Sequence, residues 1–177
     1  MGAEHEVTTW YLEMLNQSAL LPARTPAWEH RVERARRPSA AFARFLYATV
    51  GGHYGCGGVR AALVGGRFGL IDNWLRHVQD VYVDHRGLVD GAATEDERVD
   101  RLCELNVLEQ ALNVCDTTIV RDAWTRGQSL AVHTWIYGLS DGRLRDLGFT
   151  ATADAEVVPM FGAAVRGVGG NRDEPPS

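Results

Sequence analysis

The chain of 177 residues contains no lysine, and all 18 of its basic side chains are arginines. With 23 acidic residues its formal net charge is −5, which argues against a nucleic acid or an anionic membrane as its partner. No apolar run approaches the roughly 18 residues that a membrane-spanning helix needs. The first residues also lack the basic stretch and the following apolar stretch that mark a secretory signal.

Cysteine is scarce as well, with only Cys56, Cys103 and Cys115. An odd, small number excludes a disulfide framework and indicates a reduced, cytoplasmic location. We expect Cys103 and Cys115 to be small core residues. Residues 1–52 contain neither cysteine nor aspartate. The first 52 residues therefore offer neither a thiolate ligand nor an aspartate to a metal site.

The length indicates one domain, and the composition changes near residue 45. Residues 1–44 are predicted to form a divergent helical segment, in which the arginine-rich stretch 31–37 is a solvated helix face. Residues 45–166 are predicted to form an α/β core. The tail, residues 167–177, is rich in glycine, proline and charge and is predicted to be disordered.

Strands and helices alternate in the predicted core, which implies a mainly parallel central sheet flanked by helices. The predicted strands are residues 45–50, 117–120, 129–135 and 144–149. The predicted helices are residues 59–64, 70–83, 94–113 and 123–126. Thr94 and Glu97 have the spacing of a capping box. The dipeptide Asp141-Gly142 predicts a hairpin turn, so residues 144–149 should pair antiparallel with the preceding strand.

His53 and Cys56 are the side chains that carry chemistry. They lie three residues apart, directly after a predicted buried strand and directly before a predicted helix. Imidazole and thiolate are ligands that zinc prefers. Taken alone, a His and a Cys this close are more often structural than metal-binding. A nucleophilic Cys56 with His53 as its base is a further possibility in principle, but no third partner for such a pair is visible in the sequence. His133, within a predicted strand, is interpreted as a structural histidine rather than a proton shuttle.

The sequence around this pair resembles the β-class carbonic anhydrases. The resemblance begins at residues 52–59 (GHYGCGGV), which are similar to the second metal motif of that family. It continues in order, almost without gaps, to about residue 152. The further matching segments are residues 69–75 (GLIDNWL), 102–110 (LCELNVLEQ), 123–128 (AWTRGQ), 133–139 (HTWIYGL) and 141–147 (DGRLRDL).

This resemblance implies one zinc ion per subunit, reversible hydration of carbon dioxide to bicarbonate, and a homodimer or tetramer. His53 and Cys56 would be two of three protein ligands to zinc. The backbone amides of Gly57 and Gly58 would help to hold the substrate. Tyr137 matches a tyrosine of a regulatory bicarbonate pocket found in one branch of the family, although a core aromatic residue is an equal interpretation.

The chain departs from the family upstream of His53. The family places its first zinc ligand in a Cys-x-Asp-Ser-Arg motif on the first sheet strand, and this motif is absent here. We therefore expect that strand to be missing or replaced, zinc to be held weakly, and the polypeptide as written to be nearly inactive. We also expect residues 1–45 to derive from a frameshift, a wrong start or a gene rearrangement.

Two alternatives to a carbonic anhydrase stay open. One is a non-catalytic relic or dimerisation partner of an intact paralogue. The other is a hydrolase on the same scaffold that acts on carbon disulfide or carbonyl sulfide. The missing motif favours the first of these alternatives, because the second needs the same complete zinc site.

Overall fold

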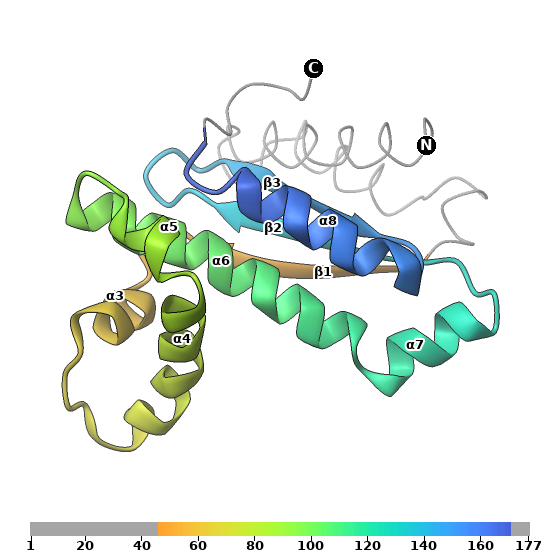
Figure 1. Ribbon diagram of the computed structural model, residues 1–177, viewed down its shortest axis with the longest axis horizontal. Helices are drawn as coiled ribbons and strands as arrows, with labels where there is room; N and C mark the ends of the chain where they lie inside the picture. The colour runs from red at the N-terminus through yellow and green to blue at the C-terminus, as the bar shows by residue number, and fades with distance from the viewer. Residues whose placement is uncertain (1–45, 171–177) are drawn as a thin grey trace, which may run out of the picture.

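The computed structural model describes residues 46–170, which form an α/β fold (Figure 1). Its sheet has three strands in the order β1-β2-β3, and helices flank the sheet. The strands are β1 (Leu46–His53), β2 (Leu130–Tyr137) and β3 (Leu144–Ala151). The helices are α3 (Gly57–Val64), the 3-10 turn η2 (Gly69–Ile71), α4 (Asp72–Asp84), α5 (Arg86–Asp90), α6 (Glu95–Cys115), α7 (Thr118–Thr125) and α8 (Asp154–Arg166).

The pairing within the sheet follows the sequence prediction. β1 and β2 run parallel, with Leu46 opposite Leu130 and His53 opposite Tyr137. β2 and β3 run antiparallel after the turn at Asp141 and Gly142. Among residues 46–170, β1 is therefore an edge strand, and the sheet contains one parallel and one antiparallel pair. The α/β fold class is confirmed.

Helix α6 is the centre of the core. It contacts β1 and β2 directly and also packs against α8, which covers β3 (Figure 1). Its N-terminus carries the predicted capping box, since the Thr94 side chain accepts from the Glu97 amide and the Glu97 side chain accepts from the Thr94 amide. The side chains that α6 buries almost completely include Val99, Leu102, Leu105, Leu108 and Ala111.

One predicted strand is wrong. Residues 117–120 do not extend the sheet, because α7 begins at Thr118. The Thr117 side chain accepts a hydrogen bond from the Val120 amide and so caps this helix. Val120 and Ala123, three residues apart, are buried, whereas Ile119 is 78% exposed. The β-branched composition suggested a strand, but the cap and the burial spacing are those of a helix.

Two helices differ from their predictions. The predicted helix over residues 70–83 begins at Asp72, and its apolar stripe is only partly buried: Leu75, Val78 and Val81 face the core, but Leu70, Ile71 and Trp74 are exposed. Helix α8, which contains Pro159, has no counterpart among the predicted helices. A turn over residues 167–170 follows it, so the first part of the predicted tail is ordered against the core through Val168. The predicted N-terminal segment and residues 171–177 lie outside the described residues.

Candidate metal centre

The sequence His53-Tyr54-Gly55-Cys56 forms the turn between β1 and α3, and we call it the ligand turn. His53 is the last residue of β1, and Cys56 is the N-cap of α3, whose first helical hydrogen bond joins the Arg60 amide to the Cys56 carbonyl at 2.9 Å. Gly55 has φ of 65°, a left-handed conformation that a side chain would strain. The turn thus brings both potential ligands to the carboxyl end of the parallel strand pair.

His53 is oriented as a metal-binding histidine is. Its ring is half-buried, and its Nδ1 lies 3.0 Å from the carbonyl oxygen of Tyr54. Because a carbonyl oxygen only accepts, Nδ1 carries the proton in the neutral ring. The lone pair then resides on Nε2, the other ring nitrogen, where it is available to a metal ion.

Cys56 is a free, half-buried thiol. Its Sγ lies on the side of the turn that faces α3 and α4, since a Cβ atom built on Gly58 would be 3.9 Å from Sγ and 3.6 Å from the Trp74 ring. A thiol in this position is partly accessible and can bind a soft metal ion as its thiolate.

Among residues 46–170, no third metal-binding side chain joins His53 and Cys56. Within residues 46–170, no group of three or more His, Cys, Asp or Glu side chains is arranged to hold a metal ion. His53 and Cys56 therefore fit one half of a zinc site. That their side chains reach a single ion stays a prediction from the spacing.

The predicted substrate and regulatory residues lie close to the ligand turn. Gly57 and Gly58 are the first two residues of α3, where backbone amides lack partners within the helix. Tyr137 is paired with His53 in the sheet register, and the Tyr54 amide donates to the Tyr137 carbonyl at 3.0 Å. Its hydroxyl lies near Gly142 of the β2–β3 turn. A substrate role for the glycines and a bicarbonate role for Tyr137 stay predictions.

The remaining cysteines and the strand histidine belong to the core, as predicted. Burial raises the pKa of the Cys103 thiol to about 12 and that of Cys115 to about 11. Such thiols stay protonated and inert at neutral pH. His133 is buried in β2, and its Nδ1 lies 2.9 Å from Oγ1 of Thr150 on β3.

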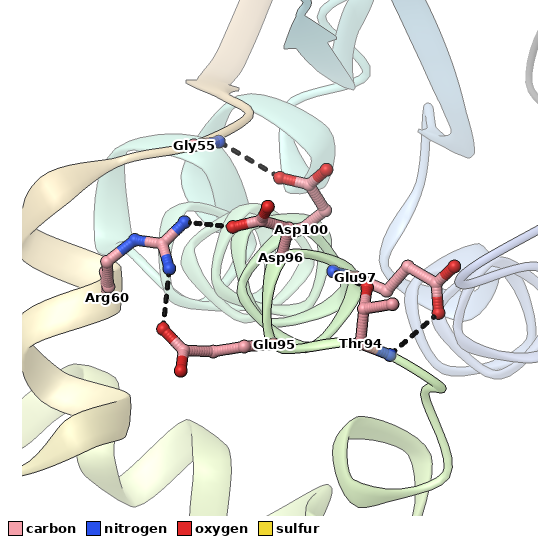
Figure 2. A network of polar contacts seen from close by, with 7 residues as sticks. All are labelled: Gly55, Arg60, Thr94, Glu95, Asp96, Glu97 and Asp100. Atoms are coloured by element: carbon pink, nitrogen blue, oxygen red, sulfur yellow. Dashed lines mark hydrogen bonds and ion pairs between the residues drawn. The ribbon is translucent and has the colours of Figure 1, made fainter.

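Side chains that sequence reasoning missed hold the ligand turn against α6. The Gly55 amide donates to Asp100 at 3.0 Å, and the Tyr54 hydroxyl donates to Glu104 at 2.5 Å. Figure 2 shows the first of these contacts beside the ion pairs that Arg60 makes with Glu95 and Asp96. These partners are 35 to 50 residues apart in sequence, and no local pattern joins them.

Comparison with known proteins gives a consistent result. Residues 46–144 match the carbonic anhydrase family. A carbonic anhydrase of Emericella nidulans is 41% identical over 101 residues, which are 57% of this chain and 44% of that protein. The chain thus spans less than half the length of this relative.

Solved structures share the fold. The β-carbonic anhydrase of Coccomyxa, described in complex with acetazolamide, superposes with a TM-score of 0.62 at 31% identity, over 69% of this chain and 55% of that one. One of two tetrameric β-carbonic anhydrases of Sordaria macrospora gives 0.56 at 27% identity, over 76% and 66% of the two chains. The sequence match and these shared folds place the chain in the β-class carbonic anhydrase family.

Proposed function

We propose that this chain is a carbonic anhydrase subunit in which His53 and Cys56 bind zinc for the reversible hydration of carbon dioxide to bicarbonate. We further propose that the polypeptide as written, on its own, has lost most of that activity. The observation that carries the first part is the ligand turn: an imidazole with Nδ1 already engaged lies three residues before a free thiol at the start of a helix.

Each residue of the turn has a chemical task in this proposal. Zinc, when bound, supplies hydroxide at neutral pH by lowering the pKa of its water toward about 7. His53 offers Nε2 and Cys56 offers a thiolate. The unpartnered amides of Gly57 and Gly58, at the positive end of α3, suit a small anion such as bicarbonate.

Reduced activity follows from the number of ligands. Catalytic zinc sites use three protein ligands and keep a fourth position open. The described residues offer two, and residues 1–45 lack the cysteine that supplies the third ligand in the family's first metal motif. A zinc ion held by one imidazole and one thiolate exchanges with solvent and has no fixed position for its water. This observation favours, as the second candidate function, a non-catalytic subunit that keeps the fold.

The test combines zinc content with hydration kinetics. We expect purified protein to bind zinc in excess metal, to lose it on dialysis, and to hydrate carbon dioxide at close to the buffer rate in a stopped-flow assay. Cys56→Ser should abolish the weak zinc binding, and Cys115→Ala, which removes a buried thiol far from the turn, should not.

Two outcomes would contradict the proposal at different points. Zinc binding that is the same in Cys56→Ser as in the wild type would show that the ligand turn is not the metal site. Stoichiometric zinc after dialysis, with a hydration rate well above buffer that Cys56→Ser abolishes, would show that a third ligand exists. His30 and Glu29 would then be the first residues to replace.

We infer a homodimer or tetramer in the cytoplasm that uses carbon dioxide and bicarbonate. The tetrameric Sordaria relatives support the assembly. Among the helices of residues 46–170, none has the length and apolar character needed to cross a membrane.

A further inference from the structure

Three acidic side chains on one face of α6 contact the ligand turn or the helix α3 that follows it. Asp96, Asp100 and Glu104 follow each other at intervals of four residues, the spacing that aligns side chains along a helix. Asp96 pairs with Arg60 of α3 at 2.5 Å, Asp100 accepts from the Gly55 amide at 3.0 Å, and Glu104 accepts from the Tyr54 hydroxyl at 2.5 Å. Figure 2 shows the first two of these contacts.

Of the three acidic side chains, Glu104 lies in the environment least favourable to a charge. Its side chain is only 3% exposed, and burying a carboxylate is unfavourable unless hydrogen bonds compensate for the lost water. Here one oxygen accepts from the Tyr54 hydroxyl, and the other accepts from the Gly169 amide at 3.2 Å. A buried acid joined in this way fixes the position of the Tyr54 side chain, and with it the middle of the ligand turn.

The strand before the turn is held against the same helix. A Cβ atom built on Gly52 would lie 2.5 Å from Cγ2 of Val107, so β1 approaches α6 as closely as only glycine permits. Val107 lies three residues after Glu104, on the continuation of the acidic face. Helix α6 therefore contacts this segment at Gly52, before the first ligand, at Tyr54 and Gly55, between the ligands, and at Arg60, after the second.

We propose that Asp100 and the pair Tyr54–Glu104 are positioning residues that hold His53 and Cys56 at the separation a metal ion needs before the ion binds. Tyr54 and Gly55 are the two residues between the ligands, and α6 holds one by its side chain and the other by its backbone amide. Fixing them in advance removes the entropy cost of ordering the turn on binding. This inference rests on the proposed function, because it takes the ligand turn to be the metal site.

Cobalt(II) is the probe, because a cobalt–thiolate bond at Cys56 gives a charge-transfer absorption that reports metal binding directly. Asp100→Ala removes the acceptor for the Gly55 amide, and Tyr54→Phe removes the hydroxyl donor to Glu104. We expect each to weaken cobalt binding about tenfold, the lower end of the usual effect of supporting residues on metal affinity. Asp100→Asn keeps an acceptor oxygen in place and should restore wild-type affinity.

Two control variants test whether the effect is specific to the turn. Glu97→Ala breaks the capping box at the same end of α6, and Asp116→Ala breaks the exposed ion pair with Arg121 at its other end. Neither carboxylate has a hydrogen bond or ion pair with the ligand turn, so both variants should bind cobalt as the wild type does. In the metal-free protein, the Gly55 amide should exchange its hydrogen faster in Asp100→Ala than in Asp100→Asn or the wild type.

The outcomes separate the inference from the function on which it rests. No cobalt–thiolate absorption in the wild type would overturn both. Absorption in the wild type with the same affinity in Asp100→Ala and Tyr54→Phe would overturn the positioning role alone. Equal weakening in Asp100→Ala, Asp100→Asn and Glu97→Ala would also overturn it, because a general loss of helix stability would then explain the data.

Discussion

At the scale of single residues, His133 shows how burial sets chemistry. It lies in β2 at 3% exposure, with its Nδ1 next to the Thr150 hydroxyl. Burial lowers the pKa of its imidazole from 6.5 to about 4, because the charged ring would lose its water. The folded protein therefore keeps His133 neutral at pH values where the unfolded chain already binds a proton.

This difference predicts acid sensitivity. The native-state pKa is depressed, so the contribution of His133 to stability is complete above pH 6.5 and is lost as the pH falls toward 4. Within that window we expect it to lower the free energy of unfolding by about 1.4 kcal/mol per pH unit. Urea unfolding of the wild type and of His133→Gln between pH 7 and 4, as a series, measures this slope.

The comparison needs a histidine that lies outside the core. His77, exposed on α4, provides it, and His77→Gln should keep the wild-type slope. A slope that is unchanged in His133→Gln would assign the acid sensitivity to other groups.

At the scale of elements, the central contact is that of β1 with α6. This contact decides where the ligand turn lies, because the turn continues directly from the strand. Gly52 makes the close approach possible, whereas its neighbour Gly51 faces the Trp135 carbonyl with ordinary space around it. Two consecutive glycines in one strand thus have different structural importance.

Adding one methyl group at each glycine tests this difference. Gly52→Ala would place Cβ 2.5 Å from Cγ2 of Val107, and such overpacking typically costs about 1–3 kcal/mol. Gly51→Ala, with Cβ 3.9 Å from the nearest atom, should be close to neutral. Chemical denaturation of both variants gives the two values.

The partner residue provides an internal check. In Gly52→Ala combined with Val107→Ala the clashing methyl group is gone, so the double variant should lose less stability than the sum of the two single variants. Strict additivity would show that Gly52 does not pack closely against Val107.

At the scale of the whole molecule, the lobe that runs from the start of α3 to the end of α4 carries six of the ten large apolar side chains that are exposed among residues 46–170. Leu70 is 90% exposed and Trp74 is 60% exposed. Their sequence neighbours Phe68 and Ile71 are each more than half exposed. This lobe projects from the sheet beside the ligand turn (Figure 1). Contiguous exposed apolar side chains are typical of interaction surfaces.

We predict that this lobe takes part in self-association. Leu70→Ser combined with Trp74→Ser should shift the protein toward the monomer in sedimentation experiments, because the apolar area available to a second copy falls. Ile119→Ser, which removes a 78% exposed side chain on α7, should leave the assembly unchanged. A double variant that associates like the wild type would exclude the lobe.

The sequence by itself determined those helices, strands and turns that depend on only a few neighbouring residues. The capping box at Thr94 and the hairpin at Asp141 and Gly142 were predictable, because each depends on neighbouring residues. The strand before the ligand turn was also predicted, over residues 45–50, although β1 continues three residues further, to His53. The motif around His53 and Cys56 also gave the family. The strand predicted over residues 117–120 was wrong. Their β-branched side chains favour a strand, but the Thr117 cap and the packing of Val120 produce a helix.

The tertiary structure alone decided what surrounds the ligands. In the sequence, Asp100 and Glu104 are simply polar positions on a predicted helix. Only the packing of α6 against β1 brings them to Gly55 and Tyr54. The exposure of Leu70 and Trp74 was equally hidden, because an apolar residue at helical spacing does not say whether anything covers it. The physical reason is one of range: local sequence encodes caps, turns and periodicity, whereas contacts between residues 45 to 50 positions apart exist only after the chain has packed.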